Sequence, residues 1–219
     1  MNTQEPVPFE IEWLSSAIAD DLRSQGFSIQ HNALPADWVG ELFQTVNDLH
    51  PQQFKAAGVG RADQHLTDET IRKDQIAWIE SSEGAQGNWL SFAGSLQREL
   101  NRQLLLGLFS FESHFAHYAP GAFYKTHVDA FKGQANRVLS VVLYLNPEWT
   151  DADGGEMVLY SETEPRQELC RVRPLAGTLA VFLSEDFPHE VKPSRRDRYS
   201  IAGWYRVNGS SVNRVDPPA

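Results

Sequence analysis

The feature that most constrains the fold is a change of hydrophobic pattern at Gly107. Beyond it, short apolar segments with strand-like alternation follow one another to residue 207, separated by pieces rich in turn residues such as NPEWTDADGG. These segments are LFSFESHFAHY, FYKTHVDA, RVLSVVLYLN, GEMVLYS, TLAVFLS, HEVKP and RYSIAGWY. Many short strands separated by turns are typical of a β-sandwich or jelly roll. We therefore predict such a fold for this half of the chain.

The part before Gly107 has helical character. Apolar residues at three- and four-residue spacing predict helices in 10–51 and 88–106, with a short strand IAWIE between them and a turn at SSEGAQGN. From 52 to 73 the pattern dissolves into glycines and charges, which predicts a long mobile loop. We expect one α+β domain in 1–219, with a β core at 108–207, helices packed on one face, and a flexible tail at 208–219.

Composition narrows the functional classes. A formal net charge of -10 argues against a nucleic-acid partner, because binding to phosphates normally requires a basic face. Cys170 is the single cysteine, so no intrachain disulfide can form and a reducing compartment, the cytoplasm, is expected. The longest apolar runs, LLLGLF and TLAVFL, are far too short to span a membrane, and we expect no membrane partner.

Three residues in the β-rich half could bind a metal ion. His127 and Asp129 are two positions apart, and on an extended strand this spacing directs both side chains to one face. His189 is the only histidine downstream of them. Two histidines and one carboxylate form the facial triad of non-haem Fe(II) oxygenases, which leaves the opposite coordination positions open. The alternative is a histidine in the core beside a loop aspartate, because a His-x-Asp pair alone has little specificity.

An arginine follows His189 by nine residues. In RYSIAGWY, alternation places Arg198, Ser200, Ala202 and Trp204 on one face of a strand. A guanidinium group there suits a ligand with a second carboxylate. Triad and arginine together therefore predict a site for iron and a dicarboxylate.

These motifs resemble those of the 2-oxoglutarate and Fe(II)-dependent dioxygenases, and among them the prolyl 4-hydroxylases of the hypoxia-inducible-factor type. The resemblance extends to IRKDQIAWIE, YLNPEW, the glycine pair of DGGEMVLY, and PHEVKP followed by RYSIAGWY, and so covers about residues 10–207. It implies a double-stranded β-helix, which is a distorted jelly roll. It also implies Fe(II) as cofactor, 2-oxoglutarate and O2 as co-substrates, ascorbate as a reductant, and a role related to oxygen sensing. The absence of a zinc-finger extension suggests a bacterial member.

The resemblance also implies roles for residues. His127, Asp129 and His189 resemble the iron ligands, and Arg198 resembles the arginine that binds the distal carboxylate of 2-oxoglutarate. Around that carboxylate, Tyr144 and Ser200 would add hydrogen bonds, and Tyr118 and Trp204 would line the pocket. Tyr144 and Trp204 could instead be ordinary strand core.

On the substrate side, the resemblance places Arg137, Arg72, Asp74 and Tyr124 where a peptide passes the entrance. Arg72 and Asp74 could also be no more than a structural ion pair. A long loop such as 52–73 is more useful for holding a polypeptide than for enclosing a small molecule.

The resemblance therefore implies hydroxylation of a prolyl residue in an exposed loop of a protein, with release of succinate and CO2. For a bacterial chain, elongation factor Tu is the leading candidate substrate. Two alternatives stay open, namely a hydroxylase of a small metabolite or free amino acid, and a jelly-roll binding module without catalysis.

Overall fold

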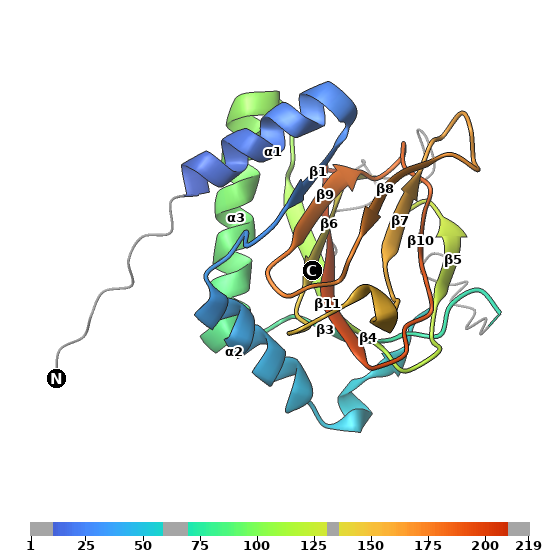
Figure 1. Ribbon diagram of the computed structural model, residues 1–219. Helices are drawn as coiled ribbons and strands as arrows, with labels where there is room; N and C mark the ends of the chain where they lie inside the picture. Colours follow the sequence, from blue (N-terminus) through green and yellow to red (C-terminus); the bar gives the residue numbers. More distant parts are fainter. Residues whose placement is uncertain (1–10, 59–69, 131–135, 210–219) are drawn as a thin grey trace, which may run out of the picture.

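The computed structural model describes residues 11–58, 70–130 and 136–209 (Figure 1). Most of the predicted mobile loop, residues 59–69, lies outside these ranges, and so does the tail from residue 210. The predictions for those two segments therefore stay predictions.

The described chain forms two facing antiparallel sheets with helices on one outer side (Figure 1). The seven-stranded sheet has the order β1-β9-β6-β11-β4-β3-β2, and the four-stranded sheet has the order β5-β10-β7-β8. The larger sheet consists of β1 (Phe27–Gln30), β9 (Leu179–Leu183), β6 (Arg137–Tyr144), β11 (Arg198–Arg206), β4 (Ser110–Tyr118), β3 (Gln75–Trp78) and β2 (Lys55–Ala56). The smaller sheet consists of β5 (Tyr124–His127), β10 (His189–Val191), β7 (Met157–Tyr160) and β8 (Glu168–Val172). This arrangement confirms the predicted jelly roll.

Three α-helices cover the outer face of the larger sheet: α1 (Ile11–Gln25), α2 (Ala36–Asn47) and α3 (Gly84–Leu104) (Figure 1). Short 3-10 helices occur at Pro51–Gln53 and Asp151–Asp153. The apolar stripe of α1 is buried, and the helix ends at Gly26, whose φ of 80° and bond to the Leu22 carbonyl form a left-handed C-terminal cap. Polar bonds fix α3 to the sheet, because Trp89 Nε1 donates to Ser113 Oγ and the Tyr205 hydroxyl donates to the Ala93 carbonyl.

The core has two layers because β-strand side chains alternate between faces. On β11, Ile201 and Tyr205 point to the helices and belong to the larger buried cluster. Ser200 points the other way and pairs in register with Tyr144, which belongs to the cluster between the sheets. The predicted face of Arg198, Ser200, Ala202 and Trp204 is therefore the inner face, directed at the smaller sheet.

Three local predictions were wrong. Strand β5 ends at His127, so Asp129 lies in a bend beyond it. Strand β8 lies in a segment with no strand prediction, because its polar outward-facing residues obscure the alternation. Helix α3 begins at Gly84, inside the predicted turn SSEGAQGN. Gly87, in the first turn of this helix, allows close packing, since a Cβ there would lie 2.2 Å from the Ser82 carbonyl oxygen.

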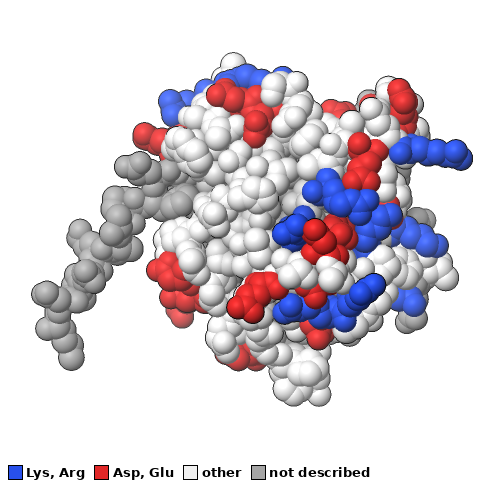
Figure 2. Space-filling model, viewed as in Figure 1, with Lys and Arg blue, Asp and Glu red and all other residues white. Residues whose placement is uncertain are grey.

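Charged side chains on the face seen in Figure 2 gather toward the side of the smaller sheet, where basic and acidic groups are neighbours. The ion pairs in this part of the chain are Arg171–Glu168, Lys192–Glu190, Arg173–Asp151 and Arg196–Asp153. Basic groups there are therefore balanced locally. In the described ranges, no helix combines the length and the apolar character needed to cross a membrane.

Candidate functional site

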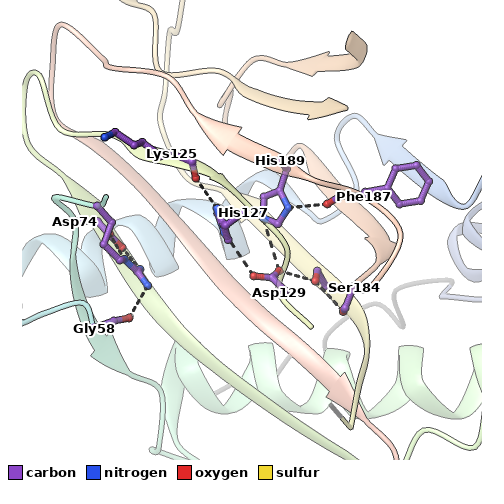
Figure 3. Close-up of polar contacts among 10 residues, drawn as sticks. Gly58, Asp74, Lys125, His127, Asp129, Ser184, Phe187 and His189 are labelled. Atoms are coloured by element: carbon purple, nitrogen blue, oxygen red, sulfur yellow. Dashed lines mark hydrogen bonds and ion pairs between the residues drawn. The ribbon is translucent and has the colours of Figure 1, made fainter. Parts of the chain in front are cut away.

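His127, Asp129 and His189 meet at the edge of the smaller sheet (Figure 3). His127 ends β5 and pairs in register with His189, the first residue of β10. Asp129 lies in the bend after β5. Its Oδ1 is 3.6 Å from His127 Nε2, and its Oδ2 is 3.7 Å from His189 Nε2. One ligand atom from each residue lies within 4.8 Å of the others. The structure thus brings the predicted triad together, although Asp129 reaches it from a bend.

Neighbouring groups orient each triad member. His127 Nδ1 lies 2.8 Å from the Lys125 carbonyl, and His189 Nδ1 lies 3.0 Å from the Phe187 carbonyl (Figure 3). A carbonyl oxygen can only accept, so both Nδ1 atoms carry the proton and both Nε2 atoms present lone pairs. Ser140 Oγ donates to Asp129 Oδ2 at 2.6 Å. Such supporting bonds fix ring tautomer and carboxylate orientation around protein-bound metals.

The electrostatics favour the protonation states that metal ligands need. Burial alone would raise the pKa of Asp129, but the adjacent imidazoles of His189 and His127 and the hydrogen bond from Ser140 outweigh it and lower that pKa. Burial, together with the neighbouring His127, lowers the pKa of His189 to about 4. At neutral pH the site therefore presents a carboxylate and a neutral imidazole, as metal binding requires. Two nitrogens and one oxygen on one side suit Fe(II) with open coordination positions.

Arg198 lies between the sheets at the start of β11 and is 1% exposed. Its Nε donates to the Gly155 carbonyl at 2.8 Å, and its Nη1 lies 3.4 Å from Ser200 Oγ. No carboxylate in the described ranges pairs with it. A buried cation without a counter-ion is costly, so this position suits an anionic ligand. Gly155, from the glycine pair, makes room here, because a Cβ would lie 3.2 Å from Arg198 Cδ.

Two tyrosines flank this guanidinium, with Tyr118 and Tyr144 ring centres 4.8 and 5.2 Å from it. The Tyr144 hydroxyl is buried and has no hydrogen-bond partner in the described part of the chain. Burial raises the pKa of Tyr144 to about 12, so the hydroxyl remains a donor. A buried donor without a partner, beside a guanidinium without a carboxylate partner, fits the distal carboxylate of 2-oxoglutarate.

Tyr144, beside Arg198, and the triad are connected through buried side chains between the sheets. Tyr144 and Phe182 belong to one buried cluster, and the Phe182 ring contacts the His189 ring at 4.8 Å. The Phe182 ring thus connects the cluster that contains Tyr144 with His189 of the triad.

Arg72, Asp74 and Tyr124 form a stack that ends on the triad. Arg72 donates to both Asp74 carboxylate oxygens, at 2.7 and 2.5 Å, and its guanidinium lies 4.2 Å from the Tyr124 ring centre. The Tyr124 ring stacks on His127 with centroids 3.5 Å apart. Burial lowers the pKa of Arg72, but the Asp74 bond outweighs it and the pKa is raised. Arg72 and Asp74 therefore do form a structural ion pair, and Arg72 also contacts Tyr124, which stacks on the triad residue His127.

Arg137, on β6, contacts Trp204 near the end of β11 that lies away from Arg198. The Arg137 guanidinium is 3.8 Å from the Trp204 ring centre and forms an ion pair with Glu112 at 2.8 Å. The Trp204 ring also contacts His114 at 5.5 Å, and His114 contacts Trp78 at 5.3 Å. Trp204 thus joins an aromatic row across the inner face, and its predicted role in the co-substrate pocket stays a prediction.

Sequence reasoning missed Ser140, Glu112, His114 and Trp78. A signal existed for the first, because Ser140 alternates in phase with Tyr144 on β6 and so faces the triad. Glu112 and His114 similarly alternate with Tyr118 on β4. Trp78 lies in the motif IAWIE and is 48% exposed, which is unusual for a tryptophan outside a binding surface.

Comparison with known proteins agrees with this site. Residues 113–206 match the family model described as the 2OG-Fe(II) oxygenase superfamily. A crystal structure of a Pseudomonas putida prolyl-4-hydroxylase is 40% identical with a TM-score of 0.80, covering 89% of this chain and 100% of that one. A Trichoplax adhaerens prolyl hydroxylase in complex with a hypoxia inducible factor oxygen degradation domain peptide is 30% identical with a TM-score of 0.78, covering 89% and 90%.

Among curated proteins, human prolyl hydroxylase EGLN3 is 30% identical over 203 residues, covering 84% of this chain and 80% of that protein. Human Egl nine homolog 1 is 31% identical over 144 residues, covering 62% of this chain. The match spans 33% of that longer protein.

The chain therefore belongs to the 2OG-Fe(II) oxygenase superfamily, which is the class that its jelly roll and His-Asp-His site define. Within that superfamily its similarity is to the prolyl hydroxylases just named. Fe(II), 2-oxoglutarate and O2 are the cofactor and co-substrates of this superfamily.

Proposed function

We propose that the chain is a 2-oxoglutarate-dependent prolyl 4-hydroxylase that acts on a prolyl residue of a protein. The observation that carries this proposal is the combination of the His127, Asp129 and His189 triad with a buried Arg198 guanidinium that has no carboxylate partner, and a Tyr144 hydroxyl that has no hydrogen-bond partner, among the described residues. A jelly roll that only bound a partner would need neither feature.

The triad residues would hold Fe(II). Iron bound there would supply, with 2-oxoglutarate and O2, the oxidation of a substrate C–H bond to an alcohol, while 2-oxoglutarate loses CO2 and becomes succinate. Arg198 would bind the distal carboxylate through charge-assisted hydrogen bonds, with Tyr144 and Ser200 as further donors. Tyr118, whose pKa burial raises, would close the pocket with its ring and exclude water.

Two groups of side chains would receive the substrate on either side of the triad. Arg72, Asp74 and Tyr124 would form one side, and Arg137 and Trp204 would form the other, as supported by the contacts within each group. Flat aromatic rings pack well on a proline ring, and arginines can donate to backbone carbonyls of an extended peptide. The Trichoplax relative was solved in complex with a hypoxia inducible factor peptide fragment, which supports a polypeptide for this chain too.

The half-exposed Trp78 favours a polypeptide over a small metabolite or free amino acid. A ligand enclosed near the iron would leave this ring in solvent, whereas a peptide lying along the row from Trp204 through His114 would cover it. Elongation factor Tu remains the candidate substrate protein by family analogy, and ascorbate remains a candidate reductant. We place the enzyme in the cytoplasm because its single cysteine suits a reducing compartment, and the net charge of -10 disfavours a nucleic-acid partner.

The test is incubation with Fe(II), 2-oxoglutarate and O2, in the presence of proline-containing peptides, free proline or elongation factor Tu. We expect succinate release that rises with peptide and a gain of one oxygen atom on a prolyl residue by mass spectrometry. His189→Ala is the control and should release none. Equally fast hydroxylation of free proline would establish the small-molecule alternative, and no succinate release under any condition would leave the binding module.

A further inference from the structure

We propose that Glu112 sets the charge preference of the proposed substrate surface, which is formed by Arg72, Asp74, Tyr124, Arg137 and Trp204, so that the enzyme disfavours acidic residues near the target proline and prefers neutral or basic ones. This inference rests on the proposed function and specifies its substrate class. It assigns a specificity role to a residue that touches neither the triad nor the co-substrate pocket.

Arg137 lies on the same strand as Ser140, the residue that supports the triad. Its guanidinium lies over the Trp204 ring at 3.8 Å, and Trp204 pairs in register with Ser140. Ser140 in turn donates to Asp129. The register of β6 with β11 shifts between Leu139 and Arg137, and Arg137, three residues before Ser140, lies no more than about 10 Å along the strand from the triad's support. An extended peptide with proline at the metal would therefore place a residue about three positions away opposite Arg137.

The Arg137 guanidinium is already paired with a carboxylate of the chain. Arg137 donates to the same oxygen of Glu112 from Nε at 3.2 Å and from Nη2 at 2.8 Å. The other Glu112 oxygen lies 3.5 Å from Arg206 Nη1. Glu112 thus bridges Arg137 and Arg206, and it neutralises the charge of Arg137 on the proposed substrate surface. Both side chains of the Arg137–Glu112 pair are 30% exposed, so a bound peptide can reach them.

The other arginine of the proposed substrate surface follows the same pattern. Arg72 is bound at two points by Asp74, whose side chain is fully buried. Both arginines flanking the triad are therefore paired with carboxylates of the chain itself. A substrate carboxylate would find no unpaired guanidinium of these two to bind.

The consequence follows from like-charge repulsion. An acidic side chain opposite Arg137 would have to displace Glu112 from its bonds or remain close to another carboxylate, and both cost free energy. A neutral side chain meets neither cost, and a basic one gains attraction to Glu112. Specificity between peptides is achieved by a repulsive group on the binding surface as much as by attraction to the preferred peptide.

The test compares Glu112→Gln with the wild type on proline peptides that differ only in charge. Gln keeps the size and hydrogen-bonding capacity but removes the negative charge. The peptides carry Asp, Asn or Lys at each position up to about four residues on either side of the proline. Both hydroxylation and anaerobic peptide binding are measured, so that an effect on binding appears in KM and Kd rather than in kcat.

For wild type we expect Asn and Lys peptides to be hydroxylated more efficiently than the Asp peptide at the position opposite Arg137. In Glu112→Gln, the ratio of kcat/KM for Asp over Asn should rise by about fivefold, as expected for loss of one partly exposed charge. Glu168→Gln is the matched control, because it breaks an exposed two-point ion pair with Arg171 on β8, a strand that contributes no residue to the proposed substrate surface. It should leave the ratio unchanged.

Two results would overturn the inference alone: an unchanged Asp/Asn ratio in Glu112→Gln, or an equal rise in Glu168→Gln. If the wild type hydroxylated no prolyl peptide of any charge, the proposed function itself would fail and this inference with it. Metal titration of Glu112→Gln serves as the folding check, because Glu112 has no contact with the triad.

Discussion

Replacing Ser140 by alanine should weaken metal binding without removing any metal ligand. Ser140 Oγ donates to Asp129 Oδ2 at 2.6 Å and is almost fully buried, with the residue 1% exposed. Once the hydroxyl is removed, that carboxylate oxygen loses a fixed donor in a place that water reaches poorly. The carboxylate can then rotate away from the two imidazoles.

The size of the effect follows from the nature of this bond. A hydrogen bond to a charged group contributes about 1.5–3 kcal/mol, which corresponds to roughly 10- to 150-fold in an equilibrium constant. Loss of supporting bonds around metal ligands typically costs about 10- to 100-fold in metal affinity. We therefore expect the Kd for Fe(II) to rise by about 10- to 100-fold in Ser140→Ala.

The assay is anaerobic calorimetric titration of Fe(II), or of Mn(II) as a redox-stable substitute. Ser184→Ala is the matched control, since Ser184 Oγ lies 2.9 Å from Ser140 Oγ and is equally buried, yet Asp129 gets its bond from Ser140. The control should change affinity by less than about threefold. Wild-type affinity in Ser140→Ala, or an equal loss in both variants, would refute the reasoning.

Three further outcomes follow from the site and its surroundings. His189→Ala should lose both stoichiometric metal binding and succinate release, and retention of either would contradict its role as a ligand. Arg198→Ala should weaken 2-oxoglutarate binding to the metal-loaded enzyme by at least about tenfold, and Tyr144→Phe by less, in anaerobic titrations; unchanged affinity in Arg198→Ala would reject the pocket. Burial lowers the pKa of His114 from 6.5 to about 4, so the unfolded chain binds that proton more tightly and stability falls as pH decreases from about 6.5 to about 4. His114→Gln should remove up to ~3 kcal/mol of this loss in urea titrations of the metal-free protein, and an equally steep pH dependence in the variant would contradict it.

Much of the fold was predictable because local pattern and tertiary environment agree. Helix α1 carries its apolar residues on one stripe, and β11 alternates strictly between core and inner face, so the sequence alone assigns both. Strand β8 was not predictable in the same way. It lies at the edge of the smaller sheet with mostly exposed residues, and its pairing with β7 defines it more than its own apolar pattern does.

The metal ligands were predictable from residue type and order, but their supports were not. Ser140 comes near Asp129 only because β6 and the bend after β5 meet in space. Glu112 similarly reaches Arg137 across 25 residues of chain. Such contacts depend on strand register, which one sequence does not specify at single-residue level. The stack of Arg72 on Tyr124 and His127 also requires two separate segments to meet, although the resemblance to prolyl hydroxylases implied that Arg72 and Tyr124 lie near the substrate.

The central claim is that this site couples 2-oxoglutarate turnover to oxygen insertion at a prolyl residue of a polypeptide. The most direct measurement is mass spectrometry of a proline-containing peptide after reaction under isotopically heavy O2, with succinate quantified in the same samples. The account predicts one heavy oxygen atom on the prolyl ring at C4, one succinate for each, and neither product with Asp129→Ala. Succinate formed without heavy oxygen on any prolyl residue of the peptides or of elongation factor Tu would contradict it.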